Sequence, residues 1–236
     1  LGPAPGRASR DRSTAPGPVT VALMKAIWNA IVSGYLKVIA PVADWLVAKR
    51  VRPNTITTVG TLCTCTAGVI FATGHIRTGG WFLGLTALFD VLDGTVARRT
   101  GTTSLFGAFY DSTLDRVADG FLLGGLVVFY ATHGQHANQG MVIVATLALI
   151  ATFLTSYTNA RAEGLGFSAR VGVLQRPERI TLLAAPQAFF GLALHGLVLA
   201  GIVTLLMVTA WVTFFQRMAY VHRTATAAPT PTSPGE

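Results

Sequence analysis

The sequence has little charge and almost no cysteine. Only 12% of its 236 residues are charged, and 51% are hydrophobic. A soluble domain usually carries about 25% charged residues, so a soluble helical core is a poor interpretation. The two cysteines, Cys63 and Cys65, would face different directions on a helix. We therefore interpret them as small packing residues and not as a disulfide or metal site.

The beginning of the sequence lacks the pattern of a cleavable signal peptide. It is rich in Pro, Gly and Arg and has no apolar core followed by a small-residue cleavage site. The Pro, Ser, Thr and Ala content predicts disordered tails over residues 1–20 and 223–236. The segment between them, residues 21–222, is expected to form a single membrane domain.

Long apolar runs dominate this segment. Five of them cover residues 54–73, 79–97, 140–160, 178–194 and 197–216, and a sixth, residues 107–132, is apolar only in its second half. Each is close to the roughly 20 residues that cross a ~30 Å hydrocarbon core. The predicted fold class is therefore an all-α integral membrane protein with six transmembrane helices.

The positive charges predict the orientation in the membrane. Of the 18 Lys and Arg residues, only Arg77 falls in a loop that six spans would place outside. Such a bias places both termini in the cytoplasm of a multi-pass protein of the cell membrane. It also accounts for the net charge of +8, so that a nucleic-acid partner is not needed to explain it.

An amphipathic helix is expected before the first span. Within residues 21–50, apolar side chains recur at steps of three and four, and lysines mark the other side. This pattern is typical of a helix that lies in the membrane interface. Pro41 is expected to break or kink it, and Pro53 is expected to start the first membrane helix.

Four carboxylates stand out within the apolar runs. Asp90 and Asp93 are three residues apart, and Asp111 and Asp115 are four apart, so each pair shares one helix face. The polar connection over residues 98–106 would make the two helices antiparallel neighbours, with all four acids near the cytoplasmic edge.

Carboxylates at this depth need a partner. Each costs about 2.5–3.5 kcal/mol near a helix centre, and a bound divalent cation would relieve that cost. Oxygen ligands favour Mg²⁺, Mn²⁺ or Ca²⁺ over Zn²⁺. Structural ion pairs with Arg98, Arg99 and Arg116 are the alternative, but they do not explain the small residues beside the acids.

The segment around the acids resembles the signature of the CDP-alcohol phosphotransferase family. That signature is D-x-x-D-G-x-x-A-R, eight residues, then G-x-x-x-D-x-x-x-D, and it matches from Asp90 to Asp115. The resemblance implies transfer of the phosphatidyl group of CDP-diacylglycerol to an alcohol, with release of CMP. It also implies a homodimer. A divalent-cation transporter is a remote alternative, because transport sites typically lie near the midplane.

The resemblance also assigns roles to residues. Asp90, Asp93 and Asp111 would bind the metal, usually Mg²⁺ with Mn²⁺ possible, and Asp115 would complete this site as the general base. The CDP group would lie against Gly94, Ala97, Arg98 and Gly107.

A second group of residues concerns the acceptor alcohol. The segments Ser156-Tyr157-Thr-Asn159-Ala-Arg161-Ala-Glu163-Gly164 and Arg176-Pro177-Glu178-Arg179 resemble the bacterial members of the family that make phosphatidylinositol phosphate. Their acceptor is inositol 1-phosphate, and the resemblance implies that Arg179 and Arg217 bind its phosphate. We expect Arg161 to lie close by and Asn159 at the rim of the same acceptor site. For any single arginine, flanking charge at the cytoplasmic end of a span is the alternative. These enzymes typically have Lys where Asn159 stands, which leaves glycerol 3-phosphate as the alternative acceptor.

Overall fold

The computed structural model of the chain describes residues 39–169 and 171–227, and all regular secondary structure in these ranges is helical. Six helices make up the body: α2 (Pro53–Ala72), α3 (Ile76–Thr100), α4 (Leu105–Thr132), α5 (Gln139–Gly164), α6 (Arg176–Phe190) and α7 (Leu197–Ala227). A helical segment, Ile39–Ala48, precedes them. Two short 3₁₀ turns, Gly134–His136 and Leu194–Gly196, lie before α5 and α7.

Local sequence signals explain where the helices begin and end. Pro53 occupies the first turn of α2, where the missing N–H of proline costs nothing. Gly101 ends α3 in the left-handed conformation, with φ of 64°, as glycine readily does. Ser104 caps α4 by accepting a hydrogen bond from the N–H of Gly107, and Asn138 caps α5 in the same way.

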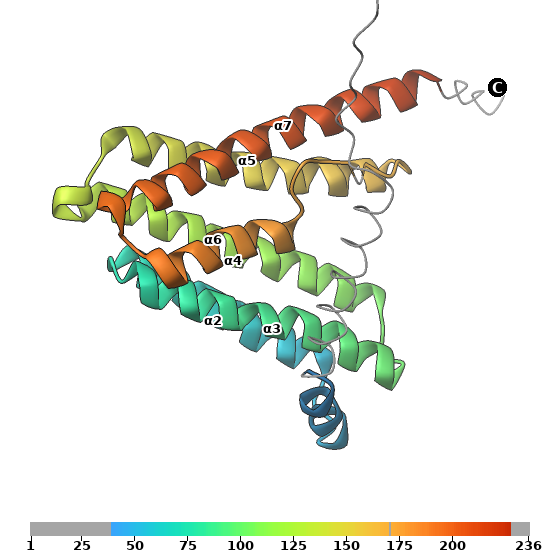
Figure 1. Ribbon diagram of the computed structural model, residues 1–236. Helices are drawn as coiled ribbons and strands as arrows, with labels where there is room; N and C mark the ends of the chain where they lie inside the picture. Colours follow the sequence, from blue (N-terminus) through green and yellow to red (C-terminus); the bar gives the residue numbers. More distant parts are fainter. Residues whose placement is uncertain (1–38, 170, 228–236) are drawn as a thin grey trace, which may run out of the picture.

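The six helices run back and forth along one direction, so that their ends gather at two ends of a bundle (Figure 1). The turns α2–α3, α4–α5 and α6–α7 lie at one end. The α3–α4 connection, the end of α5 and the end of α7 lie at the other. Helix α2 packs on α3 and α4, α3 on α6, and α5 on α4 and α7. This order brings the acidic ends of α3 and α4 close to the beginning of α6.

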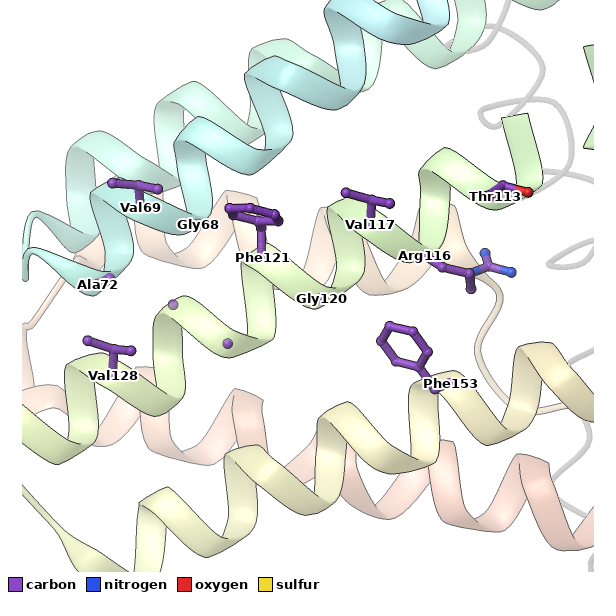
Figure 2. Close-up of a pocket in the computed structure, with 12 residues that line it drawn as sticks. Gly68, Val69, Ala72, Thr113, Arg116, Val117, Gly120, Phe121, Val128 and Phe153 are labelled. Atoms are coloured by element: carbon purple, nitrogen blue, oxygen red, sulfur yellow. The ribbon is translucent and has the colours of Figure 1, made fainter. Parts of the chain in front are cut away.

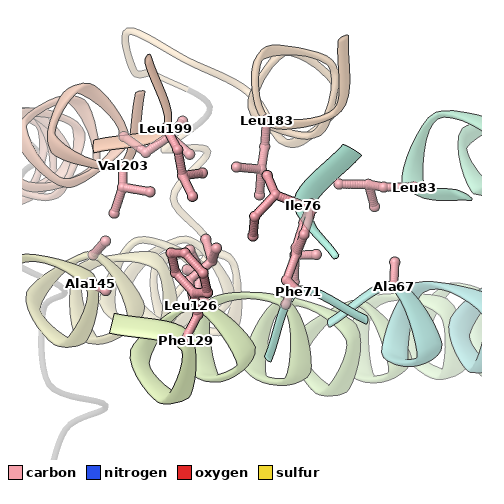
Figure 3. Packing of buried hydrophobic residues seen from close by; sticks show 14 of the residues in the cluster. Ala67, Phe71, Ile76, Leu83, Leu126, Phe129, Ala145, Leu183, Leu199 and Val203 are labelled. Atoms are coloured by element: carbon pink, nitrogen blue, oxygen red, sulfur yellow. The ribbon is translucent and has the colours of Figure 1, made fainter. Parts of the chain in front are cut away.

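One apolar core joins all six helices. Figure 3 shows Ala67 and Phe71 of α2, Leu126 and Phe129 of α4, Leu183 of α6, and Leu199 and Val203 of α7 meeting around Ile76. A second, smaller cluster joins Ile39 and Ala43 to Ile56, Leu92 and Val96. This cluster anchors the Ile39–Ala48 helix beside the starting turns of α2 and the last turns of α3.

The backbones of α2 and α4 make the closest approach in the core. A Cβ on Gly125 would lie 2.0 Å from the carbonyl oxygen of Gly68, and a Cβ on Gly68 would lie 2.4 Å from that of Phe121. Neither distance is compatible with a side chain, so both positions require glycine at this crossing. Small residues commonly allow such contact between membrane helices.

Four of the six expected spans are long and apolar enough to cross a membrane: α2, α3, α5 and the stretch Leu194–Thr226 that contains α7. Helix α4 falls short because Asp111, Asp115, Arg116 and Asp119 occupy its first half. Helix α6 has only 15 residues and begins with Arg176. The apolar run expected over 178–194 is thus interrupted after Phe190, where Gly191 ends the helix.

Two further expectations need comment. Residues 21–38, which hold most of the expected interfacial helix, lie outside the described residues. The described helix begins at Ile39, so Pro41 lies in its first described turn, and the expected break or kink at this proline stays a prediction. At the other terminus, α7 continues through residue 222 to Ala227, and the expected tail is helical over its first five residues.

Candidate active site

The two acidic pairs lie at the same end of the bundle. Asp90 and Asp93 lie on the last turns of α3, and Asp111 and Asp115 on the first turns of α4. The four residues between Thr100 and Leu105 connect these helices directly, as the sequence predicts for antiparallel neighbours. Asp93 is buried, whereas the side chain of Asp90 is half exposed.

A cavity of about 200 Å³ lies between α3 and α4 and is lined by one acid of each pair, Asp93 and Asp111. Its walls include Asp93, Gly94, Ala97, Gly107 and Asp111, together with Pro53, Asn54 and Thr57 of α2 and the α3–α4 connection. Three of the four residues expected to contact CDP therefore line the same space as two of the acids. Arg98 does not line it. Its guanidinium donates to Thr95 Oγ1 at 3.3 Å and fills the space beside Gly94.

Helix α2 contributes a contact that the sequence analysis missed. Thr57 Oγ1 donates a hydrogen bond of 2.7 Å to Asp93 Oδ2, and the backbone N–H of Gly94 donates to the other oxygen, Asp93 Oδ1. Thr57 is one turn after Pro53, and its polarity so near the start of an apolar span was the available signal. The two hydrogen bonds fix the direction of the buried carboxylate.

Arg176 lies among the carboxylates on the other side of the cluster. Its Nη1 atom is 2.8 Å from Asp90 Oδ2 and 2.8 Å from Asp115 Oδ1. Its Nε atom is 3.6 Å from Asp119 Oδ1. One guanidinium from the first turn of α6 thus joins acids of α3 and α4. The sequence interpretation assigned no role to this arginine.

Asp119 and Arg116 complete the cluster. The side chain of Asp119 is only 6% exposed, and its Oδ2 lies 3.9 Å from Arg116 Nε. Arg116 Nη2 also lies 3.5 Å from Asp115 Oδ2. Asp119 follows Asp115 by four residues and so extends the same face of α4. That spacing could have identified it as a fifth acid of the site.

The donor atoms of this cluster fit a divalent cation in kind. All are carboxylate oxygens, which Mg²⁺ and Mn²⁺ prefer. In the described part of the chain, however, no three His, Cys, Asp or Glu side chains are gathered closely enough to hold a metal as they lie. Arg176 contacts one oxygen each of Asp90 and Asp115, and Thr57 donates to one oxygen of Asp93. A bound cation would therefore share the Asp90 and Asp115 carboxylates with the Arg176 guanidinium.

A second polar cavity, of about 340 Å³, lies between α5, α6 and α7. Arg116, Arg176, Arg179 and Arg217 all line it, and Asn159, Thr155 and Ser156 line it from α5. Among the described residues around it, none is acidic. The beginning of α6 also opens on this cavity through Gln175 and Pro177, and the N-terminal end of a helix favours anions.

Hydrogen bonds hold two of these arginines in place. Arg179 Nη1 donates to Thr152 Oγ1 at 3.1 Å. Arg217 Nε donates to the carbonyl oxygen of Val171 at 2.9 Å, and its Nη1 donates to that of Thr155. These bonds connect α6 and α7 to α5. They present fixed guanidinium groups to the cavity, a geometry suited to phosphate.

The other two expected acceptor residues differ in position. Asn159 lines the cavity, and its Nδ2 donates to Glu163 Oε1 at 3.1 Å. Its Oδ1 atom is buried and has no hydrogen-bond partner. Arg161 is exposed and is not among the residues lining the cavity. The structure therefore brings together Asn159, Arg179 and Arg217, and leaves Arg161 at the surface.

A further cavity, of about 670 Å³, is an apolar groove between α2, α4 and α5 (Figure 2). Val69, Phe121, Val128 and Phe153 line it, and Arg116 lies at the end nearest the acidic cluster. Apart from Arg116 and Thr113, its described lining carries no polar side chain. The described lining of the groove therefore offers no set of side chains for catalysis or metal binding.

The chain resembles known proteins in both sequence and fold. Residues 50–222 match the CDP-alcohol phosphatidyltransferase family. The phosphatidylinositol phosphate synthase of Streptomyces avermitilis is 34% identical over 231 residues, covering 94% of this chain and 91% of that protein. A crystal structure of the phosphatidylinositol phosphate synthase of Mycobacterium tuberculosis with CDP-DAG bound superimposes with a TM-score of 0.73 at 28% identity, covering 85% of this chain and 99% of that one.

The same mycobacterial enzyme in complex with manganese and citrate also gives a TM-score of 0.73, over 84% of this chain and 93% of that one. The family match covers α2 to α7 up to residue 222, and includes the acidic pairs and both polar cavities. The chain belongs to the CDP-alcohol phosphatidyltransferase family.

Proposed function

We propose that the protein transfers the phosphatidyl group of CDP-diacylglycerol to inositol 1-phosphate and releases CMP. The observation that carries this proposal is the position of two polar cavities on either side of the acidic cluster. One contains the residues of the family signature, and the other contains four arginines. The synthases of Streptomyces and Mycobacterium that resemble this chain support the same acceptor.

The nucleotide side is assigned to Gly94, Ala97 and Gly107, where the walls are small and leave room for a bulky ligand. Arg98, which lies beside Gly94, would turn toward the pyrophosphate. Asp90, Asp93 and Asp111 would hold Mg²⁺ or Mn²⁺, in keeping with the manganese complex of the mycobacterial enzyme. When bound, the cation would neutralise pyrophosphate charge and stabilise the departing CMP.

Asp115 is assigned as the general base. It contacts Arg176 and Arg116, which both line the acceptor cavity, and it follows Asp111, which lines the nucleotide cavity, by one helical turn. The acceptor hydroxyl oxygen forms a bond to the phosphorus of the phosphatidyl group as the bond from that phosphorus to the CMP oxygen breaks. The hydroxyl proton passes to the Asp115 carboxylate.

The acceptor cavity is assigned to a phosphorylated alcohol. Arg179 and Arg217 are held by hydrogen bonds to α5 and the Val171 carbonyl, so little side-chain entropy is lost when they bind a phosphate. A cation transporter using the same acids is not favoured, because a cation path has no use for a basic cavity beside it.

Asn159 makes the identity of the acceptor testable. Product formation is measured from CDP-diacylglycerol with inositol 1-phosphate, glycerol 3-phosphate and free inositol, in the wild type and in Asn159→Lys. We expect product from inositol 1-phosphate in both, and tighter acceptor binding in the variant, because a cation is added beside the phosphate. If only glycerol 3-phosphate gives product, inositol 1-phosphate is rejected as the acceptor, and the transfer of a phosphatidyl group from CDP-diacylglycerol is retained.

The membrane arrangement proposed with this function has six spans, formed by α2 to α7 over the domain 21–222, with an interfacial helix before them. The acidic cluster and both termini face the cytoplasm of the cell membrane, and the protein is a homodimer. The bias of Lys and Arg residues supports this orientation.

The orientation is tested with single cysteines introduced at positions 135 and 225, in a protein whose Cys63 and Cys65 are replaced by alanine. Only position 135 should react with an impermeant reagent added to intact cells.

A further inference from the structure

Arg176 is the one arginine found in contact with both Asp90 and Asp115 among the described residues. The same side chain lines the acceptor cavity. Its guanidinium is largely buried, with 18% of the side chain exposed, and its Nε atom has no hydrogen-bond partner. A single side chain thus touches the proposed metal ligands on one side and the proposed acceptor space on the other.

Its contacts define what it does in the absence of a metal. Asp90, Asp115 and Asp119 come from two helices and would repel one another without a counter-ion. Arg176 contacts all three, at 2.8, 2.8 and 3.6 Å. A divalent cation at the proposed site would share the Asp90 carboxylate with Arg176, and two positive charges on one carboxylate repel each other. The guanidinium and the metal therefore compete for the negative charge of the same carboxylate.

The cavity beside it gives the displaced guanidinium a second partner. The arginine side chain is long and carries five donors, and a phosphate in this cavity would be a dianion between Arg116, Arg179 and Arg217. Turning away from Asp90 would aim the group of Arg176 at that anion. Each of the two ligands would then favour the same position of one side chain, which is the condition for coupling between sites.

Building on the proposed function, we propose that Arg176 is an exchangeable counter-ion that couples the metal site to the acceptor site. It neutralises Asp90 and Asp115 when the metal is absent. It turns to the acceptor phosphate when the metal binds. The protein would then bind metal more tightly with an anion in the acceptor cavity, and acceptor more tightly with metal in its site.

The test is a Mn²⁺ titration of the full-length protein in detergent, followed by the electron paramagnetic resonance of free Mn²⁺. Sulfate is the probe of the acceptor cavity, because it is a tetrahedral dianion that binds free Mn²⁺ weakly. In the wild type, sulfate should tighten Mn²⁺ binding. In Arg176→Gln without sulfate, the Kd for Mn²⁺ should fall by at least about fivefold, the lower range of typical coupling between sites. Sulfate should then have no further effect.

Arg99→Gln is the matched control. It removes the same charge from the same end of the bundle, but Arg99 pairs with Asp44 and not with the cluster, so its Mn²⁺ affinity should equal that of the wild type. Arg176→Lys gives a second measurement if the Gln variant does not fold. Lysine keeps the positive charge but lacks the planar guanidinium fork. The Mn²⁺ affinity of Arg176→Lys should therefore lie between those of the wild type and Arg176→Gln.

Two results would overturn the proposal. One is that Arg176→Gln binds Mn²⁺ with the same affinity as the wild type or more weakly. If only Arg176→Lys folds, the same result in that variant counts. The other is a sulfate effect that persists in a folded Arg176→Gln. The proposed function is tested separately by CMP release in the wild type. If the wild type releases CMP and Arg176→Gln has an unchanged Mn²⁺ affinity, only the coupling is rejected. If the wild type neither binds Mn²⁺ nor releases CMP, the coupling and the proposed function are both rejected.

Discussion

Thr57 donates a hydrogen bond of 2.7 Å to Asp93 across the contact between α2 and α3. The bond fixes one oxygen of a buried carboxylate that also lines the proposed nucleotide cavity. Groups that hydrogen-bond to a metal ligand fix its orientation, and their loss typically lowers metal affinity. Thr57 is therefore expected to act on the metal site without touching the metal.

Replacing Thr57 by valine should weaken Mn²⁺ binding by roughly 10- to 100-fold, the usual effect of losing such a partner. Thr57→Ser should restore most of the affinity, because it keeps the hydroxyl group. Thr61→Val is the control, since Thr61 donates only to the backbone of its own helix, at the carbonyl oxygen of Thr57. Equal Mn²⁺ affinity in Thr57→Val and wild type would show that Asp93 needs no such support.

Asp115→Asn should lose most turnover while CDP-lipid affinity stays the same. The amide keeps the shape of the side chain and removes the proton acceptor, and general-base contributions are roughly 10²- to 10⁴-fold. Initial rates and CDP-lipid binding are measured on the same preparation. Asp44→Asn is the matched control, because this exposed acid pairs with Arg99 and not with a residue of the cluster. Normal turnover in Asp115→Asn would reduce this residue to a structural role.

Arg179→Gln should raise the KM for the acceptor and leave that for CDP-diacylglycerol little changed. A lost hydrogen bond to a charged group costs about 1.5–3 kcal/mol, which is roughly ten- to a hundredfold in KM. Arg217→Gln should show the same effect together with lower thermal stability, because Arg217 also donates to Val171 and Thr155. Arg223→Gln, at an exposed position of α7, should change neither constant.

Arg161 was expected to lie close to Arg179 in the acceptor site, and the structure separates the two. Only Arg179 lines the cavity, so Arg161→Gln should affect the acceptor KM less than Arg179→Gln does. An equal or larger effect would show that the exposed Arg161 closes over the bound acceptor. Acceptor titrations of the two variants in parallel measure the difference.

Gly125→Ala should destabilise the protein, since the added Cβ would lie 2.0 Å from the carbonyl oxygen of Gly68. Overpacking of this kind typically costs about 1–3 kcal/mol. Gly124→Ala is the matched control on the neighbouring residue, where a Cβ meets no atom within 4 Å. Thermal unfolding in detergent compares the two. Equal midpoints would mean that α2 and α4 can move apart at no cost.

The sequence predicted the acidic cluster well because its spacing is a local property. Asp90 with Asp93, and Asp111 with Asp115, share helix faces by periodicity alone, and the Gly-containing connection makes the two helices neighbours. Thr57 and Arg176 could not be found in this way. Each reaches the cluster from another helix, and Arg176 is 86 residues along the chain from Asp90. Such contacts depend on how α2 and α6 pack, which no local pattern encodes.

The length of α6 is a second feature that the local sequence pattern did not predict. The apolar run over 178–194 suggested a full-length helix, but Arg176 and Arg179 turn the beginning of α6 toward polar cavities and Gly191 ends it early. Charged side chains shorten the apolar stretch of α6, as they do in the first half of α4. The residues that keep these two helices from the length and hydropathy of the other four include residues of the candidate site.

The most direct test of the proposed function is a competition between acceptors. Purified wild-type protein receives CDP-diacylglycerol, Mg²⁺, and equal concentrations of inositol 1-phosphate and glycerol 3-phosphate, and the lipid products are identified by mass spectrometry. We predict that phosphatidylinositol phosphate is the main product, that CMP is released in equal amount, and that both disappear with a metal chelator. Phosphatidylglycerol phosphate as the main product, or a reaction that continues in the chelator, would contradict this account.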